Sequence, residues 1–304
     1  MGQGSEQGTR RVRRRSRAVL AVLTAAVLGL TGCDAVGGDA SPGPSASASK
    51  RTRPAPVWDT SPASVAAVGD SITRGFDACT VLSDCPEVSW ATGSSAEVDS
   101  LAVRLLGQAE AAGRSWNYAV TGSRMEDLPG QMTRAAARRP HLVAVMVGAN
   151  DACRATTSAM TPVADFRDRF EEAMATLRAK LPKAQVYVAS IPDLKRLWSE
   201  GRTNPLGKQV WKLGLCPSML GDADATDAAA TQRRNTVRDR VRAYNDVLRD
   251  VCAKDRRCRT DGGAVHAFRF GTDQLSRWDW FHPSVSGQAR LAEIAYRAVT
   301  AEKP

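Results

Sequence analysis

The chain has 304 residues, of which 43% are hydrophobic and 24% charged. That length suffices for one domain with a sizeable core. The formal net charge is +10 at pH 7, but residues 1–32 hold six arginines and one glutamate, a net +5. The charge is therefore weak evidence for nucleic-acid binding, and we expect no nucleic-acid partner.

Residues 1–32 have the pattern of a secretory signal peptide. Residues 10–17 (RRVRRRSR) are basic, and residues 18–32 (AVLAVLTAAVLGLTG) form an apolar run that is short for a membrane-spanning helix. The run leads into LTGC, which resembles a lipobox, so we expect cleavage before Cys33 and attachment of lipid to it. The alternative is an ordinary signal peptide with an incidental cysteine. The arginines also permit twin-arginine export.

Residues 33–62 are predicted to form a flexible tether, because Gly, Ser, Ala and Pro dominate and few large apolar groups occur. The folded domain is expected at residues 63–304. A lipid, a tether and a domain in this order predict a protein anchored at the outer face of the cell membrane, or secreted. We also expect a monomer.

From residue 64, apolar runs alternate with amphipathic segments. The predicted strands cover residues 64–70, 116–122, 141–151, 184–193 and 264–268. The predicted helices cover residues 96–113, 127–139, 163–181, 233–253 and 283–301, the last with Pro283 in its first turn. Because the strands are continuous apolar runs, both faces of the sheet should be covered, which predicts an α/β fold of three layers with a five-stranded parallel sheet.

Residues 194–230 break this alternation. They are rich in tryptophan and leucine and are predicted to form a long irregular loop. Long loops in compact domains usually form walls or lids of functional sites.

Six cysteines remain beyond Cys33: Cys79, Cys85, Cys153, Cys216, Cys252 and Cys258. An even number in an exported chain favours disulfides. Six cysteines allow 15 pairings, of which the spacing favours two short loops, Cys79–Cys85 and Cys252–Cys258, and so leaves Cys153–Cys216. No C-x-x-C or paired His/Cys unit occurs, so no metal site is expected.

Ligands bind at the carboxyl ends of the strands in open parallel sheets. There the chain places GDS (69–71), TGS (121–123), GAND (148–151) and IPD (191–193). Ser71 follows the first strand directly, and a strand-to-helix turn can expose its hydroxyl as a nucleophile. Taken alone, Gly-Asp-Ser is also ordinary turn chemistry.

A nucleophilic serine needs a base, and the chain has three histidines. His141 opens the third predicted strand at its amino end, and His266 lies inside a predicted strand, so neither is expected at the site. His282 lies in a loop, where Asp279 can fix its tautomer and leave the other nitrogen for serine. The alternative is a histidine that caps the last helix.

The charge that develops on an attacked carbonyl oxygen needs fixed donors. The backbone N–H of Gly122, the side-chain amide of Asn150 and the backbone N–H of Ser71 are the candidates for such an oxyanion hole. A turn glycine and a helix-capping asparagine are the alternatives for the first two.

Four stretches carry a resemblance to a known family: VGDSITRG (68–75), YAVTGS (118–123), VGAND (147–151) and DWFHP (279–283). In order and spacing they resemble the four blocks of the SGNH (GDSL-type) hydrolase superfamily, although the first block reads GDSIT. The matching positions are Ser71, Gly122, Asn150 and His282, with Asp279 three residues before the histidine.

The resemblance spans residues 64–300. It implies a flavodoxin-like fold and hydrolysis of small-molecule or lipid esters through a Ser–His–Asp triad and an acyl-enzyme, without cofactor or metal. The chain looks like the exported lipase/esterase branch of high-GC Gram-positive bacteria. The alternatives are an esterase that deacetylates wall or plant polysaccharide and a binding lipoprotein without activity.

Overall fold

The computed structural model describes residues 57–302. The predicted signal peptide, the predicted lipidation site Cys33 and most of the predicted tether lie outside the described residues. None of the helices in residues 57–302 combines the length and the apolar character that a transmembrane span requires.

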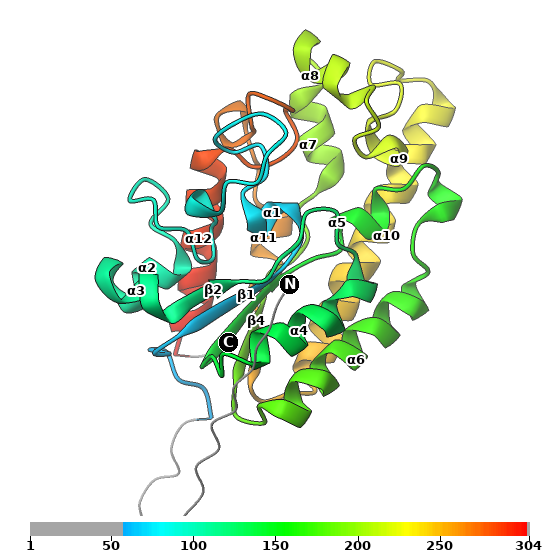
Figure 1. The fold of residues 1–304 in the computed structure, drawn as a ribbon. Helices are drawn as coiled ribbons and strands as arrows, with labels where there is room; N and C mark the ends of the chain where they lie inside the picture. Colours follow the sequence, from blue (N-terminus) through cyan, green and yellow to red (C-terminus); the bar gives the residue numbers. More distant parts are fainter. Residues whose placement is uncertain (1–56, 303–304) are drawn as a thin grey trace, which may run out of the picture. The chain divides into compact units, whose positions relative to one another are not determined.

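Five parallel strands form one sheet in the order β2–β1–β3–β4–β5 (Figure 1). The strands are β1 (Val65–Gly69), β2 (Ser115–Asn117), β3 (Leu142–Met146), β4 (Gln185–Val188) and β5 (Cys258–Thr260). Every residue of β1, β3 and β4 is buried, as expected of strands covered on both faces. The predicted three-layer α/β/α fold with a five-stranded parallel sheet is confirmed.

Two groups of helices cover the sheet (Figure 1). One group packs α6 (Val163–Lys180) between α4 (Leu128–Ala136) and α10 (Ala228–Ala253). The other contains α2 (Leu101–Leu106), α3 (Gln108–Arg114) and α12 (Val285–Thr300).

The buried side of α6 shows why these segments fold as helices. Phe166, Phe170, Ala173 and Leu177 recur at intervals of three or four residues and are fully buried. The ring of Phe166 stacks on Tyr244 of α10 with centroids 4.1 Å apart.

The shorter helices connect these elements. They are α1 (Ser71–Arg74), α5 (Ala149–Ala152), α7 (Leu194–Gly201), α8 (Pro205–Trp211), α9 (Pro217–Leu220) and α11 (Ala264–Ala267). Single 3-10 turns are η1 (Pro86–Val88), η2 (Met125–Asp127), η3 (Thr157–Ala159) and η4 (Thr272–Gln274).

The sequence prediction of residues 194–230 as an irregular loop is wrong, because the segment begins with two capped helices and a third turn. The Asp193 carboxylate accepts hydrogen bonds from the first turn of α7, and Asn204 does the same for α8. The segment nevertheless forms a wall of the pocket described below.

Three smaller predictions also fail. Residues 264–267 form helix α11, and the fifth strand is the short edge strand β5, whose sequence Cys-Arg-Thr has no apolar run to reveal it. Pro283 precedes the first turn of α12, because Ser284 is the residue that caps it through Gly287. The helix expected over residues 96–113 breaks at Gly107 into α2 and α3.

Gly69 explains how β1 can end beside β3 and turn at once into α1. Its φ is +141°, and a Cβ at this position would overlap the carbonyl oxygen of Met146. Only glycine permits so close an approach of the two strands at this point. Asp70 and Ser71 therefore lie directly at the carboxyl edge of the sheet.

Candidate active site

Ser71 is the first residue of α1 and follows β1 after one intervening residue. That residue, Asp70, caps the helix by accepting a hydrogen bond from the backbone N–H of Ile72 at 3.0 Å. The Ser71 hydroxyl oxygen lies 2.9 Å from Nε2 of His282, across 211 residues of sequence. The structure therefore brings these two predicted residues into hydrogen-bond contact.

Asp279 fixes the imidazole from the other side. Its Oδ2 contacts Nδ1 of His282, and its Oδ1 accepts hydrogen bonds of 2.9 Å from the backbone N–H groups of Phe281 and His282. The loop is closed by Ser276, whose N–H donates to the carbonyl of His282 at 2.8 Å. The imidazole consequently has one nitrogen engaged by a carboxylate and the other by a hydroxyl.

Aromatic side chains hold this loop. Phe281 is buried and meets the His282 ring edge-on at 5.8 Å between centroids. Phe76, which the sequence did not single out, meets the same ring from the nucleophile side at 5.1 Å. Trp211 of α8 donates from its indole to the carbonyl of Asp279 at 2.7 Å.

Burial and charge shift the pKa values of the groups around Ser71. Burial opposes protonation of His282, but the adjacent Asp279 carboxylate outweighs that effect. Asp77 and Asp70 act in the same direction, so the pKa of His282 is raised above 6.5. Burial likewise opposes ionisation of Asp279, but the charge and hydrogen bond of His282 lower its pKa. Burial raises the pKa of Asp70 to about 7.

Two of the predicted oxyanion donors are backbone N–H groups at Ser71 and Gly122. Within residues 57–302 neither group donates a hydrogen bond to another protein atom, and both residues line the same pocket. Gly122 has a φ of +86°, and a Cβ there would meet nothing within 4 Å. Its main chain is thus open towards a ligand.

Asn150, the third predicted donor, lies in the first turn of α5. Its Nδ2 donates one hydrogen bond to the carbonyl of Ser123 at 3.0 Å. That contact fixes the amide and leaves its second N–H group available.

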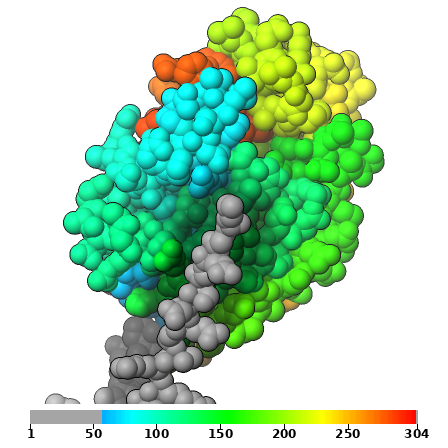
Figure 2. Space-filling view, viewed as in Figure 1, coloured from blue at the N-terminus to red at the C-terminus, as the bar shows by residue number. Residues whose placement is uncertain are grey.

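A pocket of about 250 Å³ joins these groups. Its polar side contains Ser71, Gly122, Asn150 and His282. Its apolar side is built from Ile72, Phe76, Leu194, Leu197, Leu215 and Phe281. Of these, Leu194 and Leu197 belong to α7, and Leu215 lies in the segment after α8. Figure 2 shows the yellow-green surface around α8 beside the cyan segment that follows α1.

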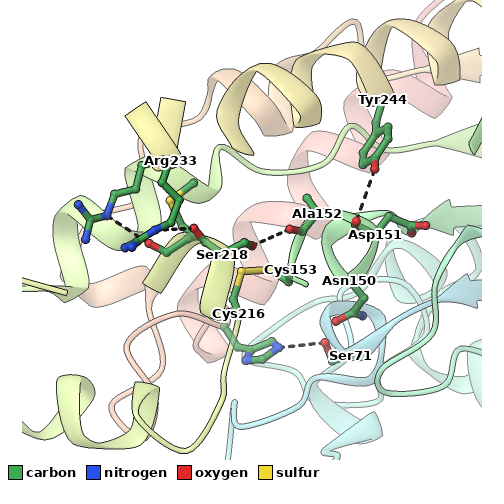
Figure 3. The surroundings of a disulfide bond; sticks show 12 residues. Ser71, Asn150, Asp151, Ala152, Cys153, Cys216, Ser218, Arg233 and Tyr244 are labelled. Carbon is green, nitrogen blue, oxygen red and sulfur yellow. Dashed lines mark hydrogen bonds between the residues drawn. A yellow bond between two sulfur atoms is a disulfide. The ribbon is translucent and has the colours of Figure 1, made fainter. Parts of the chain in front are cut away.

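Three disulfides join the pairs that the spacing favours: Cys79–Cys85, Cys153–Cys216 and Cys252–Cys258. Cys153 ends α5, three residues after Asn150, and Cys216 precedes α9 and lines the pocket. Figure 3 shows the Cys153–Cys216 bond close to Asn150 and Ser71. Disulfides are typical of exported chains, so they are consistent with the predicted export.

The other two histidines lie elsewhere, as the sequence predicted. His141 accepts a hydrogen bond from the N–H of Ala63 at 3.2 Å before β3 begins. His266 lies in α11, not in a strand, and its Nδ1 pairs with the carbonyl of Ile191 at 2.9 Å. Neither lines the pocket.

Among residues 57–302, two clusters have side chains of metal-binding type. Cys79 and Cys85, beside Glu87, are joined in a disulfide and offer no thiolate. Asp77, Asp279 and His282 place ligand atoms within 4.8 Å of one another, but Nδ1 of His282 already contacts Asp279. We interpret the second cluster as a hydrogen-bonded array. Asp77 had no signal in the sequence, because its contact spans about two hundred residues.

Several solved structures of other proteins are similar to this chain. Phospholipase A1 from Streptomyces albidoflavus NA297 is 17% identical over 79% of this chain and 100% of its own, with a TM-score of 0.45. The extracellular lipase of Streptomyces rimosus is 16% identical over 76% and 99%, with a TM-score of 0.42. A family 3 carbohydrate esterase from Clostridium thermocellum is 14% identical over 77% and 94%, with a TM-score of 0.44.

These similarities are too low to carry an argument about substrate. No curated protein matches the sequence. The model of the GDSL-like Lipase/Acylhydrolase family matches residues 65–295, and the chain therefore belongs to that family.

Proposed function

We propose that the protein hydrolyses carboxylic esters through an acyl-enzyme formed on Ser71. The observation that carries the proposal is the 2.9 Å contact between the Ser71 hydroxyl and Nε2 of His282, with Asp279 on the opposite nitrogen. A serine, an imidazole and a carboxylate in this order supply a nucleophile, a base and a group that orients the base.

The reaction has two halves. In the first, Ser71 attacks the ester carbonyl while Nε2 of His282 takes its proton, and the imidazolium then gives that proton to the leaving alcohol. In the second, water attacks the acyl-enzyme with His282 as base, and the acid leaves as Ser71 regains its proton. Asp279 keeps the imidazole in the tautomer that accepts at Nε2.

The backbone N–H groups of Ser71 and Gly122 and the free N–H of the Asn150 amide hold the developing oxyanion. All three residues line the pocket, and the two backbone donors have no acceptor among the described residues. Donors fixed before the reaction act more strongly than water, because they need no reorientation as charge develops.

The pocket favours an ester with an apolar acyl chain over an acetyl group on a polysaccharide. Leucines of residues 194–215 and two phenylalanines line the pocket together with the candidate nucleophile. Burying the methylene groups of an acyl chain there stabilises binding by about 0.8 kcal/mol each, whereas an acetyl group leaves most of this surface without a partner.

The N-terminal region completes the proposal. We infer that residues 1–32 direct export, that Cys33 is lipidated and that residues 33–62 tether a monomeric hydrolase domain to the membrane. We also propose that the protein belongs to the exported lipase/esterase branch of high-GC Gram-positive bacteria that the motifs resemble. The pattern RRVRRRSR, the apolar run and LTGC support this part, together with the three disulfides. Metabolic labelling with an alkyne fatty acid should mark the wild type and leave Cys33→Ala unmarked.

A fluorophosphonate probe tests the nucleophile. We expect labelling of the wild type and of Ser286→Ala, a control serine exposed on α12, and no labelling of Ser71→Ala. A series of p-nitrophenyl esters from acetate to palmitate then ranks acyl lengths. Labelling of Ser71→Ala equal to that of the wild type contradicts the proposal, and a maximum at acetate contradicts the preference for longer apolar chains.

A further inference from the structure

Asp77 is a buried acid behind His282 that the reaction described above does not use. Only 1% of its surface is exposed. Its carboxyl group, the carboxylate of Asp279 and an imidazole nitrogen of His282 place atoms within 4.8 Å of one another. Asp77 therefore adds a second buried acid to the array of Asp279, His282 and Ser71.

The main chain holds Asp77 in this position. Its φ of +57° is in the left-handed region, which aspartate adopts more readily than most residues. Its N–H donates to the carbonyl of Ser83 at 3.0 Å, within the loop that the Cys79–Cys85 disulfide closes. Its carbonyl accepts a 2.6 Å hydrogen bond from the hydroxyl of Ser276, at the start of the Asp279 loop.

The two carboxyl groups differ in their hydrogen bonds. Asp279 accepts from two backbone N–H groups and contacts the imidazole, whereas Asp77 accepts from one backbone N–H, that of Leu82. Two adjacent buried carboxylates repel each other strongly, so one of them tends to keep a proton. The poorer set of donors assigns that proton to Asp77.

The charges nearby agree with this assignment. Burial first, and then the charge of Asp279, raise the pKa of Asp77 to about 6, while the pKa of Asp279 is lowered. Asp70, on the β1 side, is the other acid whose charge reaches His282. No lysine or arginine among residues 57–302 forms an ion pair with any of these three acids.

We propose that Asp77 is a positioning residue of the acid–base array, whose buried carboxyl group controls how readily His282 gives up its proton to become the neutral base. The proposal rests on the hydrolase function proposed above. An ionised Asp77 favours the imidazolium and so keeps the base blocked. A neutral group at the same position lets the imidazole lose its proton at lower pH and accept from Ser71.

Asp77→Asn tests this control, because the amide keeps an acceptor for the N–H of Leu82 but cannot ionise. Without a negative charge at this position, the pKa of His282 should fall. We expect the acid limb of kcat/KM against pH to move down by about one pH unit. The plateau at high pH should stay within about threefold of the wild type, since Asp279 keeps its contacts with His282.

Asp273→Asn is the matched control, because this exposed carboxylate lies six residues before Asp279 and has no side-chain contact in the described part of the chain. It removes one charge and should leave the acid limb in place. Thermal midpoints verify that both variants fold.

Proton NMR of the imidazole provides a readout that needs no activity, because the chain has three histidines. The His282 signal, assigned with His282→Gln, should titrate at lower pH in Asp77→Asn than in the wild type. Identical titration curves and identical acid limbs in the two proteins overturn the role of Asp77. Absence of fluorophosphonate labelling overturns the hydrolase proposal instead, and the NMR titration still reports whether the charge of Asp77 acts on His282.

Discussion

Removal of the Cys153–Cys216 disulfide is the perturbation with the most specific consequences. The bond connects the residue that ends α5, behind Asn150, to the wall formed by residues 214–216. Replacing both cysteines with serine should lower stability and activity together, because one cross-link braces the oxyanion side and the opposite wall of the pocket.

The magnitude follows from the length of the closed loop. A cross-link restricts the unfolded chain more when it closes a longer loop, and the sequence separation here is 63 residues. The chain-entropy model gives about 4 kcal/mol for this separation. The Cys252–Cys258 bond spans 6 residues, for which the same model gives about 2 kcal/mol.

The assay compares the two double serine variants by thermal unfolding and by ester hydrolysis. For a domain of this size, about 4 kcal/mol corresponds to a fall in Tm of roughly 10 °C, and about 2 kcal/mol to roughly 5 °C. Two hydrogen bonds of Ser218, from its hydroxyl to Ala152 and from its N–H to Arg154, still hold the wall to α5. The loss in kcat/KM should therefore be about tenfold in Cys153→Ser/Cys216→Ser and negligible in the control pair.

Two results would refute this reasoning. One is a Tm for Cys252→Ser/Cys258→Ser that is as low as that of the long-loop variant, which would mean that loop length does not control the effect. The other is a normal kcat/KM in Cys153→Ser/Cys216→Ser at a temperature where the variant is folded, which would separate the disulfide from the site.

Three further predictions concern single residues. His282→Ala should lower kcat by about 10⁴-fold or more. Asp279→Asn should lower kcat by less, because two backbone contacts still hold the loop. Steady-state kinetics with a p-nitrophenyl ester compares the two variants, and an equal loss of kcat contradicts this prediction. Asn150→Ala should lower kcat by about 10²-fold with little change in KM, since the amide acts on the transition state; a change confined to KM contradicts that role. Burial raises the pKa of Asp151 to about 6, so the folded state binds its proton more tightly than the unfolded state, and this contribution to stability is present below pH 3.8 and lost as pH rises through 6. Asp151→Asn, whose amide can pair with the Thr161 hydroxyl and the Met125 N–H, should therefore gain up to about 3 kcal/mol relative to the wild type between pH 4 and pH 8 in urea unfolding, and a constant difference across that range contradicts the assignment.

The strands that lie inside the sheet could be predicted because burial on two faces leaves a continuous apolar run. Residues 141–151 gave the clearest run, and they contain β3, whose five residues are all buried. The edge strand β5 could not be found in this way, since an edge position tolerates Arg259 between Cys258 and Thr260. Periodicity therefore located the interior of the sheet and missed its border.

The site could be predicted as far as its residues follow strand ends. Ser71, Gly122 and Asn150 come directly after successive strands or their extensions, and a parallel sheet brings such positions to one edge. His282 was reached by excluding the other two histidines, and the structure places it 2.9 Å from Ser71. The helices of residues 194–211 were not predicted because Asn204 and Pro205 lie between them. In a sequence alone, this pair of residues is typical of a loop.

Asp77 marks the limit of such reasoning. No motif contains it, and its neighbours Cys79 and Cys85 draw attention only to a disulfide. Its importance arises from burial beside Asp279, which depends on how the loop after α1 packs against the loop before α12. Sequence order can predict which groups meet at the edge of a sheet, but the proton balance of a buried acid pair is set by contacts between loops, and only coordinates supply those. If the charge of Asp77 controls the protonation of His282, the pH at which this hydrolase works is determined by a residue outside the four motif blocks.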